Sequence, residues 1–141
     1  MRRARSGQTL IMFAITMTFV FLSLIALVGN ADTLMVRYNQ VNSEALLGAQ
    51  SGATAIDEEA FYRGEHRLDP VLAVQRCESI ALSGGNATTH SVTCTFDPPN
   101  RVTATVSQVV RLPIPLFLTT ATVRASRTGQ AVFGGAQVVG P

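Results

Sequence analysis

Leu10-Ile-Met-Phe-Ala-Ile-Thr-Met-Thr-Phe-Val-Phe-Leu-Ser-Leu-Ile-Ala-Leu-Val28 is an apolar stretch that only two threonines and one serine interrupt. No charged residue lies between Arg5 and Asp32. The three hydroxyl groups are compatible with an apolar helix, because they can bond back to its main chain. About 20 apolar residues cross a bilayer. The stretch therefore predicts a transmembrane helix over residues 8–31.

The charges on the two sides of this stretch differ. All eleven basic residues of the 141-residue chain are arginines, and Arg2, Arg3 and Arg5 precede the stretch. Eight arginines and nine acidic residues follow it. Basic residues gather on the cytoplasmic flank of membrane helices, which predicts a cytoplasmic N-terminus and an extracytoplasmic C-terminal part. The length left after the helix suits one small domain.

Helical periodicity continues beyond the apolar stretch, over residues 32–64. Apolar residues recur there at steps of three and four positions. Side chains one turn apart on this face are small and allow another element to approach closely. They form a predicted helix-packing seam of Ala45, Gly48, Ala49, Gly52 and Ala53. Its partner is either the chain's own domain or a neighbouring subunit.

Residues 65–141 are predicted to form a small α+β domain. Asp69-Pro70 is typical of a helix start, and Gly84-Gly85 of its end. The apolar face of this helix is expected to hold Val71, Leu72, Val74, Cys77, Ile80 and Ala81. Alternating side chains predict antiparallel strands at residues 90–96, 102–109 and 120–126. Two prolines exclude Leu112–Leu118 from an interior strand, so this segment is expected to cover the core as a lid, or to form a surface patch.

Cys77 and Cys94 both lie in the part predicted to be extracytoplasmic, where disulfides persist. We expect a bridge between the short helix and the first strand, with two free thiols as the alternative. His66 and His90 lack the paired spacing of zinc ligands. The chain has no lysine and no phosphate-binding loop. The sequence thus predicts no catalytic residue, metal or cofactor, and the absence of a basic cluster argues against nucleic-acid binding.

Residues 1–7 form a short basic leader that directly abuts the apolar stretch. In a prepilin, the leader is removed on the cytoplasmic side and the helix is retained. A secretory signal peptide would instead be cut near Ala31, which would release the domain. A third possibility is a plain uncleaved anchor.

Gly7-Gln-Thr-Leu-Ile-Met-Phe-Ala14, the apolar stretch and the Ala/Gly-rich helix with Asp32, Arg37, Tyr38 and Gln40 resemble the N-terminal region of TadE-like and TadG-like proteins of the tight-adherence (Flp) pilus system. The resemblance covers residues 7–53. It implies cleavage between Gly7 and Gln8, a pilin-like fold and a single-pass location in a bacterial inner or cytoplasmic membrane. The implied partners are membrane lipid and other pilin-like subunits or pilus-assembly proteins, in homo- or hetero-oligomers.

Met12 is a departure from the TadE-like pattern, which usually has Glu at this position. In pilins, that Glu is associated with pairing to the new amino terminus of a neighbouring subunit. The TadG-like branch tolerates an apolar residue there. The expected function is a minor pseudopilin or assembly component. The alternatives are a generic anchored binding module, with a groove between residues 70–82 and the sheet as its site, and a secreted domain.

Overall fold

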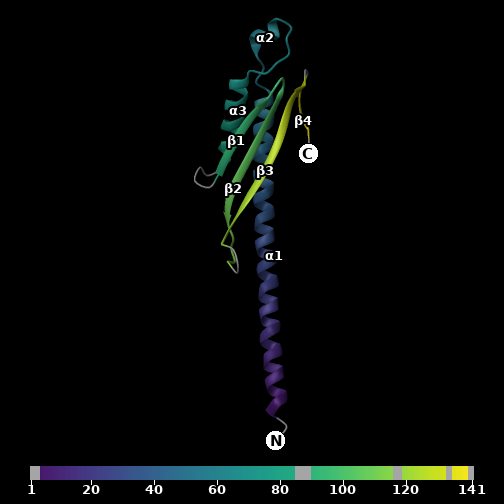
Figure 1. Ribbon diagram of the computed structural model, residues 1–141, viewed down its shortest axis with the longest axis vertical. Coiled ribbons are helices and arrows are strands. Elements are labelled where there is room, and N and C mark those ends of the chain that lie inside the picture. The colour runs from purple at the N-terminus through teal and green to yellow at the C-terminus, as the bar shows by residue number, and fades with distance from the viewer. Residues whose placement is uncertain (1–3, 85–89, 116–118, 133–134, 140–141) are drawn as a thin grey trace.

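The computed structural model describes residues 4–84, 90–115, 119–132 and 135–139. Three helices come first, α1 (Ala4–Ala53), α2 (Glu58–Tyr62) and α3 (Pro70–Ser83). The strands β1 (His90–Asp97), β2 (Arg101–Arg111), β3 (Thr120–Val132) and β4 (Gly135–Val139) follow. This α+β arrangement, a long N-terminal helix before a short helix and an antiparallel sheet, is the one predicted from the sequence (Figure 1).

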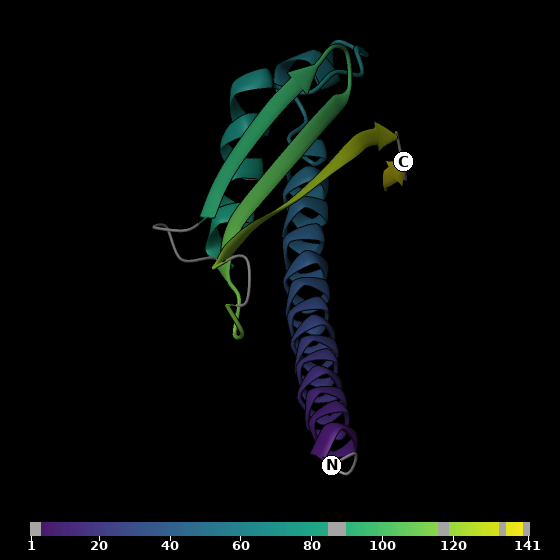
Figure 2. The ribbon, with the colours of Figure 1, turned by 60° about the horizontal axis from the view of Figure 1, so that its bottom comes forward.

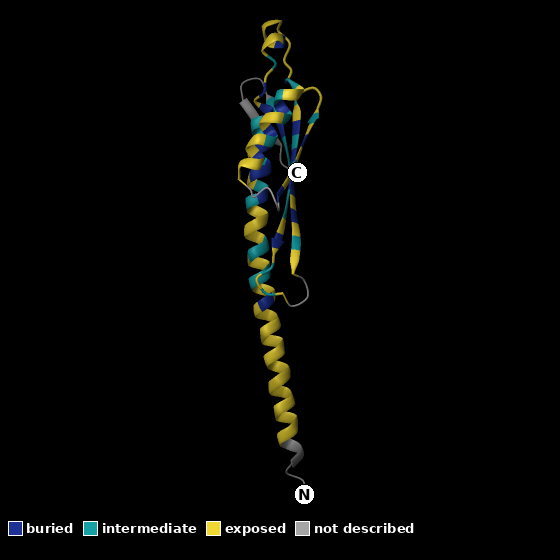
Figure 3. Cartoon of the chain, turned by 90° about the vertical axis from the view of Figure 1, so that its left-hand side faces the viewer, coloured by how far each residue is buried: buried dark blue, intermediate teal, exposed yellow. Residues whose placement is uncertain are grey.

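The helix α1 has 50 residues and is about 75 Å long at the usual rise per residue. Its N-terminal half extends away from the domain, whereas its C-terminal half lies along the sheet (Figure 1). Burial follows the same division, because buried positions gather where α1 runs beside the sheet (Figure 3).

The end of α1 corrects the prediction of one helix continuing to residue 64. The helix ends at Ala53, and an isolated antiparallel bridge pairs Ile56 with Leu68. The main-chain N–H of Asp57 donates to the main-chain carbonyl of Arg67 at 3.1 Å, which keeps the chain extended after α1. Asp57 then caps α2. Gly64, the expected end of the long helix, instead follows the short α2 with a positive φ of 82°.

The start of α3 confirms the prediction made from Asp69-Pro70. The Asp69 carboxylate accepts hydrogen bonds from the N–H groups of Val71 and Leu72 at 2.9 and 3.1 Å, and Gly84 caps the other end. The expected buried face is confirmed at Cys77 and Ala81, and Leu72 and Val74 are half-buried against the core, but two of its members lie outside it. Ala73, Cys77 and Ala81 are buried, whereas Val71 and Ile80 are exposed, because α1 approaches α3 along the three buried residues.

The four strands form one antiparallel sheet in the order β1-β2-β3-β4. The predicted strands are confirmed, with β3 extended to Val132 and paired there with β4. The helices α1 and α3 lie on one face of this sheet (Figure 2). The core between them consists mostly of alanine, valine and cysteine side chains, among them Val41, Val102 and Val106.

Candidate functional site on the long helix

The N-terminal half of α1 presents apolar side chains around its whole circumference. From Gly7 to Ile25 every residue is exposed, and this run is about 27 Å long at 1.5 Å per residue. Within Leu10–Val28 the polar side chains do not offer free donors, since the hydroxyls of Thr16, Thr18 and Ser23 donate to the carbonyls four residues earlier at 2.8 to 2.9 Å. By length and composition this helix suits a membrane span, so the chain is compatible with a single-pass anchor.

The residues expected at a leader-cleavage site lie near the start of this exposed run. Gly7 and Gln8 are exposed, and a side chain added at Gly7 would meet no other atom. Met12 is 63% exposed and continues the apolar surface where TadE-like proteins usually carry Glu. These positions therefore present only apolar or uncharged groups. Residues 1–3 of the predicted leader lie outside the described residues.

The predicted helix-packing seam faces the chain's own domain. Ala45, Gly48, Ala49, Gly52 and Ala53 are all buried. A β-carbon at Gly48 would lie 2.9 Å from the Ala81 β-carbon, and one at Gly52 would lie 2.9 Å from the Ala73 carbonyl oxygen. Of the two partners left open by the sequence, the structure places the chain's own α3 and sheet against this seam. Between α3 and the sheet Ala73, Cys77 and Ala81 are buried, whereas a hollow of about 410 Å³ lies at the N-terminal end of α3, between Pro70 and Phe96 of β1.

The disulfide predicted between Cys77 and Cys94 is present. It joins α3 to β1 across the core, and both residues are buried. Because Cys77 also contacts the seam at Gly48 and Gly52, the bridge fixes the helix that α1 packs against.

A polar contact links α1 to the connection between β2 and β3. The side-chain amide of Asn30 donates to the carbonyl of Ile114 at 3.0 Å, and its oxygen accepts the N–H of Ile114 at 3.2 Å. In the described part of the predicted Leu112–Leu118 segment, Ile114 thus contacts α1. Leu116–Leu118, the rest of that predicted segment, lies outside the described residues.

Glu44 and His90 form a buried polar pair that the sequence analysis did not single out. Glu44 Oε2 lies 3.3 Å from His90 Nε2, and the side chains are 10% and 1% exposed. Glu44 Oε1 also accepts a hydrogen bond from Gln40 at 3.1 Å. Glu44 lies on the helical face that also carries Val41 and Ala45. Its three-residue spacing from Val41 was therefore the sequence signal that it is buried.

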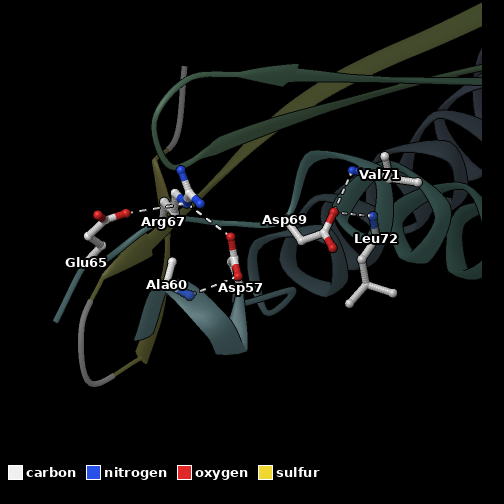
Figure 4. Close-up of polar contacts among 7 residues, drawn as sticks. All are labelled: Asp57, Ala60, Glu65, Arg67, Asp69, Val71 and Leu72. Atoms are coloured by element: carbon white, nitrogen blue, oxygen red, sulfur yellow. Dashed lines mark hydrogen bonds and ion pairs between the residues drawn. The ribbon is translucent and has the colours of Figure 1, made fainter. Parts of the chain in front are cut away.

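At the end of the domain farthest from the N-terminus, the side chains of Asp57 and Asp69 accept hydrogen bonds from main-chain N–H groups (Figure 4). Asp57 accepts the N–H of Ala60 at 3.0 Å and pairs with Arg67 at 3.0 Å. The Ala60 N–H, followed by the Arg67 guanidinium, lowers the pKa of the Asp57 carboxyl. An open cleft of about 690 Å³ lies here, lined by side chains that include Phe61, Tyr62 and Arg76.

The described residues hold no group of three or more His, Cys, Asp or Glu side chains placed to bind a metal ion. The features that stand out chemically are thus the exposed apolar helix, its contact with Ile114 and the open cleft. No family model, curated protein or solved structure matches the chain.

Proposed function

We propose that the chain is a minor pseudopilin or assembly component of a tight-adherence pilus system. In this proposal α1 crosses a bacterial inner or cytoplasmic membrane, with the N-terminus in the cytoplasm and the α+β domain outside. The observation that supports it best is the division of α1. One continuous helix is apolar from Leu10 to Val28 and exposed there at every position but Ala26, and its C-terminal part packs on the domain up to Ala53. Basic residues Arg2, Arg3 and Arg5 support the orientation.

The contact between α1 and the β2–β3 connection supports retention of the helix over secretion. Cleavage near Ala31 would remove Asn30 and, with it, both hydrogen bonds to Ile114. It would also remove Ala26, which is only 2% exposed. A released domain would therefore lose native contacts as well as its anchor.

Assembly in this proposal takes place through the exposed half of α1. The small-residue seam is buried within the chain, so packing against other pilin-like helices falls to the exposed apolar side chains of α1, most of which lie in residues 10–28. Met12 supplies no carboxylate to pair with a neighbouring amino terminus, so apolar contacts have to carry the association. The domain then presents its distal end to partners outside the membrane.

Replacing the membrane span tests this function against a generic anchor. Deletion of the gene should abolish pili and surface adherence, and the intact chain should restore both. A matched variant carries an unrelated apolar helix of equal length in place of residues 8–25 and should enter the membrane without restoring pili. Pili that persist after the deletion would contradict the proposal. Full rescue by the replaced span would favour a generic anchor.

The cleft beside α2 supports the second candidate function, an anchored binding module. Its lining combines aromatic and charged side chains, among them Phe61, Glu58 and Arg76, and such mixed concave surfaces bind small molecules. A small-molecule screen by thermal shift should then find ligands whose effect is lost in Arg76→Ala. If no ligand shifts the melting temperature, this candidate function is rejected.

A further inference from the structure

We propose that the connection between β2 and β3 is a second membrane contact, with Leu112–Pro115 resting on the bilayer surface on the domain side. This inference rests on the proposed function, because it requires α1 to cross the membrane. The connection lies at the end of the sheet nearer the exposed half of α1 (Figures 1 and 3).

The contact with α1 fixes this connection in place. The Asn30 side-chain oxygen accepts a hydrogen bond from the Ile114 N–H at 3.2 Å, and its amide group donates to the Ile114 carbonyl at 3.0 Å. A β-carbon at Gly29 would lie 3.7 Å from the Ile114 Cδ1 atom, which is ordinary van der Waals contact. The position of Ile114 along α1 is therefore set by the helix.

The position of this contact matches the boundary of a bilayer. The apolar stretch Leu10–Val28, which is exposed at every position but Ala26, spans about 27 Å along the helix axis, close to the hydrocarbon thickness of about 30 Å. Asn30 lies about 3 Å beyond Val28 along the helix axis. The polar layer on each side of the hydrocarbon is about 5–8 Å deep. If residues 10–28 fill the hydrocarbon, Asn30 and Ile114 lie at the inner edge of the headgroup layer.

The chemistry of the connection suits that layer. No charged residue occurs from Leu112 to Val123. The Leu112 N–H donates to the Thr119 carbonyl at 3.0 Å and the Ile114 N–H donates to Asn30, while Pro113 and Pro115 have no N–H. Every main-chain donor from Leu112 to Pro115 is thus either bonded or missing, which lowers the cost of leaving water.

A charged residue also borders the connection on the domain side. Arg111 is exposed at the end of β2, directly before Leu112. Its guanidinium matches the geometry of a lipid phosphate. An apolar segment next to an arginine, continuous with the apolar face of α1, favours a lipid surface over a protein partner.

Tryptophan fluorescence measures the depth of the connection directly, because the chain contains no tryptophan. Pro113→Trp and Pro115→Trp are placed at two exposed positions of the connection. Phe21→Trp, in the exposed apolar run, reports on the span itself, and Tyr62→Trp, at a residue that is 88% exposed on α2, reports on the distal end. Each full-length variant is reconstituted in phosphatidylcholine vesicles with or without lipids brominated near the top of the acyl chains. Mass spectrometry of the unreduced protein checks that each variant keeps its disulfide.

We expect blue-shifted emission and a loss of intensity with brominated lipid for both proline variants and for Phe21→Trp, but not for Tyr62→Trp. The inference is overturned if Phe21→Trp is quenched while both proline variants emit like Tyr62→Trp. That result would leave the membrane span intact and place the connection in water or against a protein. If Phe21→Trp is not quenched either, the proposed membrane anchor fails, and the inference fails with it.

Discussion

Gly129 of β3 lies so close to the main-chain carbonyl of Ala49 in α1 that a β-carbon at residue 129 has no room. The Ala53 β-carbon would lie 3.3 Å from the same position. The long helix and the sheet thus touch main chain to main chain, and glycine is required on the strand because it has no side chain.

Gly129→Ala tests this close approach. The added methyl group has to push β3 away from α1, and such overpacking costs about 1–3 kcal/mol of unfolding free energy. Denaturant unfolding in detergent, followed by circular dichroism, measures the loss. Gly7→Ala is the matched control, because a β-carbon there meets nothing within 4 Å, and it should show no loss. Equal stability of the two variants would mean that α1 and β3 do not pack this closely.

Removing the disulfide should destabilise the domain without changing its fold. Cys77 and Cys94 are separated by 17 residues, and closing a loop of this size contributes on the order of 3 kcal/mol in the chain-entropy model. The double variant Cys77→Ala/Cys94→Ala should unfold at lower denaturant concentration, and reductant should lower the midpoint of the natural chain but not that of the variant. A natural chain that does not respond to reductant would contradict a bridge that stabilises the domain.

The buried pair of Glu44 and His90 should show energetic coupling. Each side chain is shielded from water, so replacing one alone leaves Glu44 Oε2 or His90 Nε2 buried without the polar atom that now lies 3.3 Å away. In a double-mutant cycle with Glu44→Leu and His90→Leu, the two losses should not add, and the coupling should be about 0.5–3 kcal/mol. Ser126→Ala, on the exposed face of β3, serves as a distant control for His90→Leu and should give no coupling. Additive losses for the buried pair would show that the two side chains do not interact.

The lowered pKa of Asp57 gives the distal end of the domain a pH dependence. Hydrogen bonding to Ala60 and pairing with Arg67 favour the ionised carboxyl in the folded state. This stabilisation is present above the unfolded pKa of about 4 and is lost as the pH falls through the lower, folded value. The ¹³C signal of the Asp57 carboxyl should therefore titrate below the normal range, and Arg67→Gln should move the midpoint upward. If the Asp57 carboxyl of the natural chain titrated with a normal midpoint, its contacts with Ala60 and Arg67 would not favour the ionised form.

Local signals predicted much of this fold. Asp69-Pro70 predicted the start of α3, because an aspartate cap and a proline in the first turn act within a few residues. The alternation of apolar and polar side chains predicted the strands, because this pattern too is set by neighbouring residues. The small residues from Ala45 to Ala53 predicted close packing, but their spacing does not encode which surface they meet.

The features that were missed depend on contacts distant in the sequence. The helical pattern continues to Ile56, yet α1 ends at Ala53 because Ile56 pairs with Leu68 and Asp57 caps a new helix. Val71 and Ile80 were expected to be buried, but α1 approaches α3 along Ala73, Cys77 and Ala81, and Val71 and Ile80 are exposed. The contacts of Asn30 and Glu44 join residues far apart in the chain, and no local pattern marks their partners.

The amino terminus of the protein isolated from the membrane fraction tests the central claim most directly. If α1 is a retained anchor, sequencing of that terminus should give Gln8 for a processed pseudopilin, or Met1 or Arg2 for an uncleaved chain, with residues 8–31 present in each case. A mature protein that begins at Asp32 and is recovered outside the membrane would contradict the account, because the exposed half of α1 would then be a discarded signal.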